Sequence, residues 1–412
     1  MRLLHTSDWH LGQTLHNHDR AWEHQQFLDW LLNTLAEHDI DALLISGDVY
    51  DNANPSAATQ RMLYGFLMAA RQRVPHLNIV LIAGNHDSPG RLEAPAPFLE
   101  GFDARVVGVV RRDTEGNINV AEMIVPLRNR AGEIAAWCLA IPFLRISDVP
   151  RLDSQGDAYL EGIRALYQQA QTQVRACRQA DQALIAMGHC HMAGGQVSEQ
   201  SERRIVIGGA EMLSSSVFDA DIAYAALGHL HLAQKVGGTE HIRYCGSPLP
   251  LSFAEVDYPH QVLKVELEGA RLTGVETIKV PRAVELLRVP REPAPIEVVE
   301  ATLAALELAE CEDNARPYLE VRVRLEGPEP GLRARIEAAL EGKPVRLARI
   351  ETRTATSSTP FNDTLRTLDD LGQLDPVAIF SDVFQRKYGE AAPDTLLAAL
   401  NEILNQPDAV TE

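Results

Sequence analysis

One pattern recurs along the first 231 residues, in which an apolar strand ends at or beside a small residue and metal-ligand side chains follow at once. The clearest example is the stretch 77–83, which is apolar apart from Asn78 and rich in β-branched residues, as in a strand buried on both faces. It runs into Gly84-Asn85-His86-Asp87. Taken alone, this tetrapeptide would suit an ordinary β-turn equally well. Its recurrence elsewhere in the chain is what favours a functional site.

The first ninety residues predict a β-α-β-α-β order. Strands are expected at 2–7, 41–46 and 77–83, with helices at 20–38 and 55–73 between them. The first strand runs into Asp8-Trp9-His10, and the second into Gly47-Asp48. Parallel strands joined by helices bring their carboxyl ends to one edge of a sheet, where α/β folds place their sites. The three polar clusters are therefore expected to meet.

Two later strands repeat the plan. The apolar run 183–187 precedes Gly188-His189-Cys190-His191, and 224–227 precedes Gly228-His229-Leu230-His231. A single buried histidine is usually a satisfied core residue, but five clusters in phase with strand ends favour ligands. The donors are oxygen and imidazole with no thiolate, which favours manganese, iron or zinc over magnesium or calcium alone. Seven ligands suit two ions that share one carboxylate, and Asp48 at the central strand is the expected bridge.

Composition restricts the alternatives only in part. Hydrophobic residues make up 45% of the 412 residues, so a full-sized core is expected. The net charge of −19 disfavours non-specific binding to nucleic acid. The five scattered cysteines contain no Cys-x-x-Cys pair, which argues against a disulfide framework or a structural zinc site. The start turns polar too soon for a signal peptide, and no apolar run approaches spanning length. We expect a cytoplasmic protein without a membrane anchor.

The amino-acid composition of the chain changes near residue 282, where a proline-rich stretch begins. A helix at 296–309, a strand at 317–325, a helix at 330–341 and a strand at 344–353 are expected beyond it, forming a small α/β domain. Its segment 316–353 holds nine Arg or Lys against six Glu. Arg322 and Arg324 share one face of a strand and present either an ion-paired solvated surface or a phosphate-contacting one. The expected domains are 1–281, 282–356 and 357–412, the last a linker with a helical, partner-docking tail.

The five clusters resemble the ordered motifs of the calcineurin-like metallophosphoesterases. The matching segments are Asp8-x-His10, Gly47-Asp48, Gly84-Asn85-His86-Asp87, Gly188-His189 and Gly228-x-Leu230-His231. The stretches 6–12, 47–51 and 244–253 resemble more closely one branch of that family, the SbcD nuclease subunits that partner an SbcC-type ATPase. This resemblance implies an α/β fold: a metallophosphoesterase β-sandwich flanked by helices, a small α/β capping domain that binds DNA, and a C-terminal helical tail.

The resemblance also implies roles for individual residues. One metal ion would be held by Asp8, His10, Asp48 and His231, and the other by Asp48, Asn85, His189 and His229. His86 would be a catalytic histidine that is not a ligand, oriented by Asp87. His191 is interpreted as a supporting or structural residue, and Asp51 as one that orients a ligand.

The function implied is that of a Mn²⁺-dependent DNA nuclease with two divalent metal ions, working with an SbcC-type ATPase in DNA repair, replication and recombination. Its expected activities are 3′→5′ exonuclease on duplex ends and endonuclease on hairpins or single strands. A homodimer through the helix at 55–73 would fit the family, as would association with the nucleoid. The first alternative is a phosphatase or phosphodiesterase of the same fold with a non-DNA substrate. The second is an adaptor with a degenerate site, which is disfavoured because every ligand position is filled.

Overall fold

The computed structural model describes residues 1–354 except 100, 102, 153–155, 197–211 and 328, together with 384, 393 and 396. The chain divides into two compact units, Met1–Arg353 and Thr354–Glu412. Nearly all of the second unit lies outside the described residues, and so does the expected helical tail. No helix in the described part of the chain is long and apolar enough to cross a membrane.

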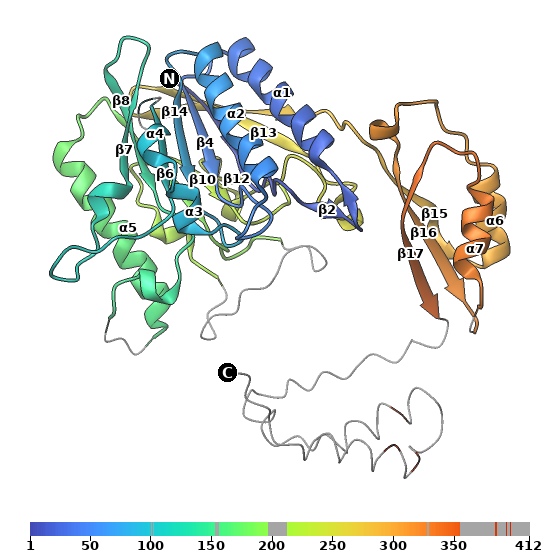
Figure 1. The fold of residues 1–412 in the computed structure, drawn as a ribbon. Coiled ribbons are helices and arrows are strands. Elements are labelled where there is room, and N and C mark those ends of the chain that lie inside the picture. Colours follow the sequence, from blue (N-terminus) through green and yellow to red (C-terminus); the bar gives the residue numbers. More distant parts are fainter. Residues whose placement is uncertain are drawn as a thin grey trace. The chain divides into compact units, whose positions relative to one another are not determined.

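Two six-stranded sheets form the centre of the first unit (Figure 1). In the first sheet the four strands β1, β4, β5 and β6 run parallel, and β13 joins β1 and β14 in antiparallel pairs. Its strands, in spatial order, are β14 (Arg271–Lys279), β13 (Gln261–Glu268), β1 (Arg2–Thr6), β4 (Ala42–Ser46), β5 (Asn78–Ile82) and β6 (Ala104–Val107). The parallel order predicted for the first three strands is confirmed.

The second sheet is also mixed, with β8, β9, β10 and β12 parallel and antiparallel edges on both sides. Its strands, in spatial order, are β11 (Gln234–Lys235), β12 (Ile242–Tyr244), β10 (Ile222–Gly228), β9 (Ala183–His189), β8 (Ile134–Ala140) and β7 (Ile124–Arg128). One hydrophobic cluster contains residues of both sheets, such as Leu44 and Ala186, so the sheets pack face to face. This is the β-sandwich that the family resemblance implied.

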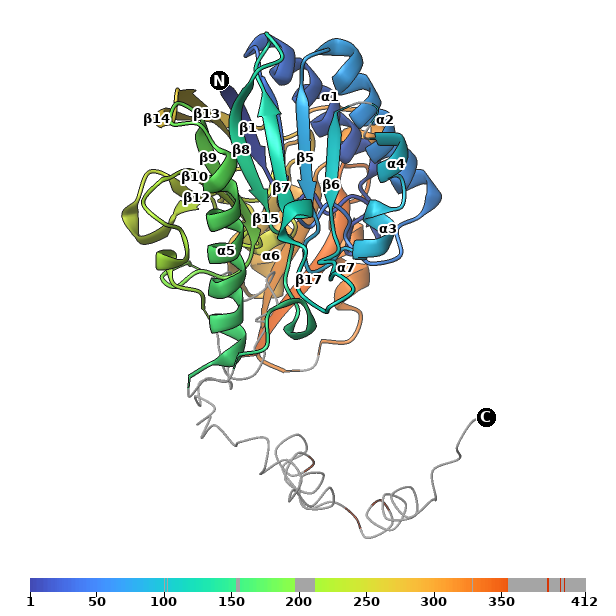
Figure 2. The same cartoon turned by 90° about the vertical axis from the view of Figure 1, so that its left-hand side faces the viewer.

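Helices cover the outer faces of this sandwich, as the two views in Figures 1 and 2 show. On the first sheet lie α1 (Ala21–Glu37) and α2 (Ala57–Arg73), whose apolar stripes share a cluster with β4 and β5. On the second lies α5 (Ala158–Cys177), which begins where the Asp157 carboxylate caps the backbone N–H groups of Tyr159 and Leu160. The short helices are α3 (Pro89–Glu93), α4 (Ala96–Leu99), η2 (Val120–Met123), η3 (Ile146–Asp148), η4 (Ser215–Val217), η5 (Val236–Gly238), η6 (Phe253–Glu255) and η7 (Asp313–Ala315).

A three-stranded sheet backed by two helices follows, which we call the capping module. Its elements are β15 (Leu286–Ala294), α6 (Ile296–Ala304), β16 (Tyr318–Leu325), α7 (Leu332–Ala339) and β17 (Arg346–Thr354). Its own core packs the helices on one face of the sheet. The expected helix at 296–309 ends early, at Ala304. The proline-rich stretch contains β15, a strand that the sequence did not predict, because an edge strand tolerates prolines such as Pro290 and Pro293.

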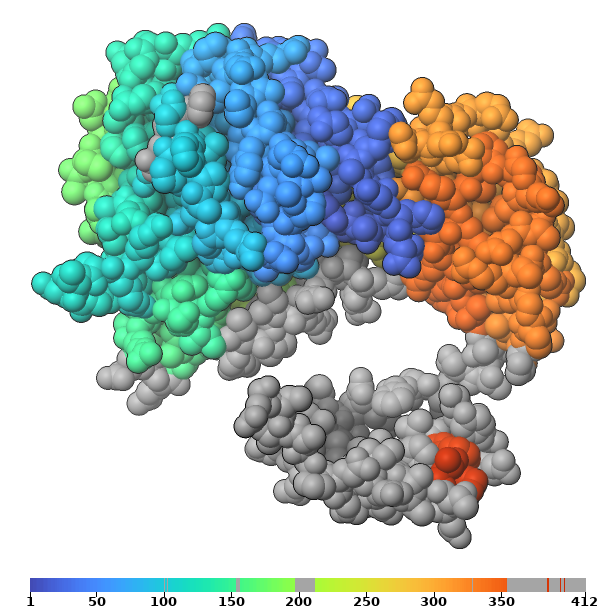
Figure 3. Space-filling view, viewed as in Figure 1, coloured from blue at the N-terminus to red at the C-terminus, as the bar shows by residue number. Residues whose placement is uncertain are grey.

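The capping module contacts the small hairpin of β2 (Thr14–Leu15) and β3 (His18–Asp19) (Figure 3). Leu15 and Tyr318 belong to one buried cluster, and the Tyr318 hydroxyl donates a hydrogen bond to the Asp19 carbonyl at 3.3 Å. The guanidinium of Arg346 lies 3.8 Å from the centre of the Tyr318 ring, within cation–π range. The hairpin follows the first candidate ligands directly in sequence, so this contact joins the module to the loop that carries them.

Candidate metal centre

The carboxyl ends of five strands bring all the predicted site residues to one edge of the sandwich. Main-chain hydrogen bonds join the first two loops, from the Asp8 N–H to the Gly47 carbonyl and from the His10 N–H to the Asp48 carbonyl, both at 3.0 Å. The residues follow their strands in this way: Asp8 and His10 after β1, Asp48 after β4, Asn85, His86 and Asp87 after β5, His189 at the end of β9, and His229 and His231 after β10.

Glycines at these strand ends allow the loops to approach closely. A Cβ atom on Gly84 would overlap the Asp48 carboxylate, and one on Gly228 would overlap the Ser46 carbonyl. Four of the site residues have left-handed backbones that are uncommon outside glycine, with φ values of 54° at Asp8, 46° at His10, 47° at Asp48 and 103° at His229. Strain of this kind is concentrated at functional sites. The local backbone therefore supports the same conclusion as the side chains.

Asp48 lies at the centre of the cluster and is 2% exposed. Its Oδ2 is 3.3 Å from His189 Nε2 and 3.6 Å from His10 Nε2, while its Oδ1 accepts the His86 N–H at 2.9 Å. Burial alone would raise the pKa of Asp48, but the neighbouring His189, His10 and His86 outweigh it and hold the pKa well below its usual range. The carboxylate is thus ionised and faces both halves of the site.

Asn85 joins the two histidines on one side of Asp48. Its amide oxygen lies 3.0 Å from His189 Nε2 and 3.0 Å from His229 Nδ1. Burial lowers the pKa of His189, but attraction by Asp48 overcomes this effect and raises it to about 9. Burial and the proximity of His189 lower the pKa of His229 to about 3. These opposite shifts show two imidazoles that compete for positive charge within one small volume.

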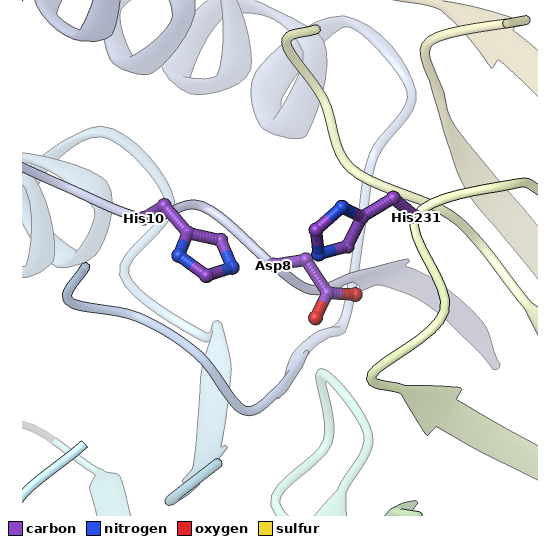
Figure 4. A group of neighbouring side chains, drawn as sticks. All are labelled: Asp8, His10 and His231. Atoms are coloured by element: carbon purple, nitrogen blue, oxygen red, sulfur yellow. The ribbon is translucent and has the colours of Figure 1, made fainter. Parts of the chain in front are cut away.

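Asp8, His10 and His231 form the group on the other side (Figure 4). One ligand atom from each lies within 4.8 Å of the others, and all three residues are buried. The Asp8 carboxylate is held by the His229 N–H at 3.0 Å and by the Ser7 hydroxyl. Asp8 also forms a second group with Asp48 and His189. The two sides of the centre are therefore contiguous.

These residues fit divalent metal ions. The His189 Nδ1 donates to the Ser46 carbonyl at 2.9 Å, which turns Nε2 toward the oxygens of Asp48 and Asn85. When the Nε2 proton is displaced, Nε2 presents a lone pair to these oxygens. An acceptor nitrogen among acceptor oxygens is stabilised when a cation lies between them. The His10 Nε2 is likewise buried and makes no hydrogen bond within the described residues. The donor set contains oxygen and imidazole only, as expected.

His86 lies beside this cluster and is less buried than the aspartates and histidines among the candidate ligands. Its ring centre is 4.8 Å from that of His10, and its Nδ1 lies 2.8 Å from the main-chain carbonyl of Asp51. A carbonyl can only accept, so Nδ1 carries a proton and donates it. The Asp51 carboxylate lies 3.3 Å from His10 Nδ1, the ligand-orienting position expected for it.

Asp87 does not orient His86, contrary to our expectation. Its buried carboxylate accepts backbone N–H groups of Gly84 at 2.8 Å, Tyr50 at 2.9 Å and Val49 at 3.2 Å. Burial and the adjacent Asp48 raise the pKa of Asp87 to about 6, against these three hydrogen bonds, which lower it. The residue ties the loop after β4 to the loop after β5, because two turns packed this closely leave amides without water.

We expect Asp87→Asn to destabilise the fold by about 1–3 kcal/mol, since the amide NH₂ group would face N–H donors and leave one of them unsatisfied. Urea unfolding of the metal-free chain measures this difference. Asp113→Asn, at an exposed turn with similar backbone hydrogen bonds, is the matched control and should cost less. An Asp87→Asn chain as stable as the wild type would contradict the bracing role.

Sequence reasoning missed two parts of the site. Glu255, in η6, contacts His231 and had no preceding apolar strand to mark it. An apolar pocket also adjoins the centre, reaching His189 and His229. Its other lining residues include Phe143 from the loop after β8, Tyr159 and Ile163 from α5, and Met212 and Leu213. Only the spatial proximity of these segments reveals it.

Comparison with known proteins identifies the family. The family model for calcineurin-like phosphoesterase matches residues 1–233, and the model described as Type 5 capsule protein repressor C-terminal domain matches 282–388. The SbcD subunit of the nuclease SbcCD from Rhodobacter capsulatus is 40% identical over 391 residues, covering 93% of this chain and 94% of that protein. The chain belongs to the SbcD family.

Other SbcD proteins match over shorter spans. The SbcD subunit of the nuclease SbcCD from Escherichia coli K12 is 34% identical, covering 84% of this chain and 83% of that protein. Its namesake from Bacillus subtilis is 37% identical, covering 68% of this chain and 69% of that protein. As an SbcD-family member with a calcineurin-like domain, the chain is a metal-dependent phosphoesterase.

Proposed function

We propose that this SbcD-family chain is a Mn²⁺-dependent DNA nuclease, with 3′→5′ exonuclease activity on duplex ends and endonuclease activity on hairpins and single strands. The observation that carries the proposal is the centre in which Asp48 faces two groups of oxygen and imidazole donors. The relatives named as nuclease subunits favour a nucleic-acid substrate over other phosphoesters. Action in DNA end processing, repair, replication and recombination, in the cytoplasm and on the nucleoid, follows from the same proposal.

Different residues would bind the metal ions and transfer the proton. Asp8, His10, Asp48 and His231 would hold one ion, and Asp48, Asn85, His189 and His229 the other. When bound, a pair of divalent ions supplies an activated water and neutralises charge developing on the phosphoryl oxygens. The neutral amide of Asn85 limits the negative charge that an anionic substrate meets. His86 lies beside the ligands with Nδ1 donating to the Asp51 carbonyl. In the imidazolium form the ring carries a second proton on Nε2, which it would donate to the leaving oxygen.

A phosphatase acting on a non-DNA substrate is the second candidate function. Protein phosphatases of this superfamily have Asp-Arg-Gly where this chain has Asp51-Asn52, so their phosphate-binding arginine is missing here. A direct comparison separates the two functions. We expect bis(p-nitrophenyl) phosphate, a diester, to be hydrolysed faster than p-nitrophenyl phosphate, a monoester, in the presence of Mn²⁺. Preference for the monoester would favour the phosphatase.

Of the two arginines predicted to contact DNA from the capping module, one remains a candidate. Arg322 forms an ion pair with Glu351 at 2.8 Å, which fits the ion-paired, solvated surface that we considered. The neighbouring pair of Arg349 with Glu320, at 3.4 Å, extends this network. Arg324 is exposed and is the better candidate for a phosphate contact. We keep the proposed limits of this domain at 282 and 356.

Association with an SbcC-type ATPase is proposed through the tail, residues 357–412. Deleting 366–412 should leave Mn²⁺-dependent phosphodiesterase activity within about twofold of the wild type, because every proposed metal ligand and His86 lie before residue 232. The same deletion should weaken capture of the ATPase by at least about tenfold, the loss of roughly 1.4 kcal/mol of binding free energy. A pull-down with undiminished capture would move the docking surface elsewhere.

A homodimer through α2 and its neighbours is proposed as well. Met68 on α2 is 47% exposed and Phe98 on α4 is 78% exposed, while Leu99 shares the α2 hydrophobic cluster. A contiguous exposed apolar patch is typical of interfaces, and we propose that these two side chains belong to one. Phe98→Asp should convert a dimer to a monomer in analytical ultracentrifugation without loss of stability. Ile146→Asp, at another exposed apolar residue, is the control. A wild-type chain that sediments as a monomer at micromolar concentration would refute the dimer.

A further inference from the structure

Glu255 is a fully buried carboxylate at the end of η6. Its Oε1 lies 2.8 Å from the Nδ1 of His231, and its Oε2 accepts the Leu251 N–H at 2.8 Å. Both oxygens thus have defined partners. A fully buried carboxylate is costly unless its charge is matched, so this contact with a histidine of the metal centre calls for an explanation.

The contact fixes which nitrogen of His231 carries the proton. A carboxylate accepts, so Nδ1 donates and the Nε2 lone pair remains for a ligand. Figure 4 shows the imidazole of His231 against the Asp8 carboxylate, and ligand atoms of Asp8, His10 and His231 lie within 4.8 Å of one another. A carboxylate behind a ligating imidazole also makes it a stronger donor to a metal ion.

The segment that carries Glu255 is braced by hydrogen bonds from Arg20 and Gln13. Arg20, which is fully buried and paired with Glu23 at 2.9 Å, donates to the Pro250 carbonyl at 2.8 Å. Gln13 donates to the Leu251 carbonyl at 2.7 Å. These bonds originate in the segment that follows Asp8 and His10, so the ligand loop and the Glu255 segment are held in register.

We infer that Glu255 is a positioning residue for His231, and through it for one of the two metal ions only. The inference rests on the proposed two-metal centre. Glu255 sets the tautomer and orientation of His231 and therefore controls affinity at the site of Asp8, His10 and His231. The site of Asn85, His189 and His229 does not depend on it, because the Ser46 carbonyl orients His189.

Glu255→Gln tests this inference with little change in volume. Its side-chain NH₂ would face Nδ1 and favour the opposite tautomer, with the proton on Nε2 where the metal ion must bind. Mn²⁺ titration of the full chain, followed by the electron paramagnetic resonance signal of free Mn²⁺, should show one of two sites weakened by about 10–100-fold and the other unchanged. Glu255→Gln combined with His231→Ala should bind Mn²⁺ no more weakly than His231→Ala alone.

Glu93→Gln is the matched control, since Glu93 is a buried carboxylate that accepts the Gly108 and Val109 N–H groups away from the candidate ligands. It should leave both sites intact. Glu255→Gln with both affinities at the wild-type value, or with both lowered equally, would overturn the inference. A wild-type chain that binds fewer than two Mn²⁺ ions would instead overturn the proposed two-metal centre.

A second measurement decides the matter even if Glu255→Gln does not fold. In ¹⁵N-histidine NMR spectra of the metal-free wild-type chain, the His231 signals, assigned by their loss in His231→Asn, should show a protonated Nδ1 and a bare Nε2. A bare Nδ1 would overturn the inference whatever the variant does.

Discussion

Replacing Asp48 with alanine should give a folded chain that binds neither metal ion and hydrolyses phosphodiesters on the order of 10³-fold more slowly, or worse. The reason is its position between His189, at 3.3 Å, and His10, at 3.6 Å, so that its carboxylate faces both halves of the centre. Metal-derived stabilisation of the transition state is worth several kcal/mol, and about 1.4 kcal/mol corresponds to tenfold in rate. Isothermal titration with Mn²⁺ and initial rates on a diester measure the two effects.

The control for Asp48→Ala has to separate loss of a ligand from relief of backbone strain. Asp39 and Asp103 are also left-handed aspartates, with φ values of 55° and 51°, but both are exposed and lie outside the site. Asp39→Ala should therefore bind two Mn²⁺ ions and turn over at the wild-type rate. Retention of one full-affinity Mn²⁺ site in Asp48→Ala would show that Asp48 does not bridge.

His86→Ala should separate binding from turnover. We expect both Mn²⁺ affinities within about threefold of the wild type, because His86 contributes no proposed ligand. We expect kcat to fall by about 10²–10⁴-fold, the usual contribution of a positioned proton donor. The main-chain carbonyl of Asp51, 2.8 Å from Nδ1, holds the imidazole in the orientation that this role requires.

Varying the leaving group of the diester tests whether His86 acts as a proton donor. Diesters with a better leaving group need less proton donation, so the deficit of His86→Ala should shrink as the leaving-group pKa falls. A deficit of equal size on every diester would point to a role in binding or positioning instead. His76→Ala, at a half-buried histidine outside the site, is the control and should behave as the wild type.

The pattern of strand ends predicted most of the fold that places the site. Buried strands that are connected by helices form a parallel sheet. The approach of Asp8, Asp48 and Asn85 could therefore be predicted from the order of strands and helices alone. The histidines of β9 and β10 come from the second sheet, and the family resemblance, rather than periodicity, placed that sheet against the first. Their contacts with Asn85 then follow from packing.

The sequence could not show which way each side chain points or which residues hold the ligands in place. Asp87 follows His86 directly, yet its side chain turns back to three backbone amides, because close packing of two loops decides which donors need a partner. Glu255 lies 24 residues beyond His231 in a turn with no periodic pattern. The strand β15 was hidden by its prolines, which only its edge position explains.

The most direct test of the central claim is cleavage of an end-labelled, hairpin-ended DNA duplex by the purified chain. It is run with Mn²⁺ and with Mg²⁺, with and without an SbcC-type ATPase and ATP, and with Asp48→Ala as the blank. We predict cleavage that requires Mn²⁺ and Asp48 and is extended or redirected by the partner. No DNA cleavage under any of these conditions, alongside hydrolysis of a small phosphodiester, would contradict the nuclease proposal while leaving the metal centre in place.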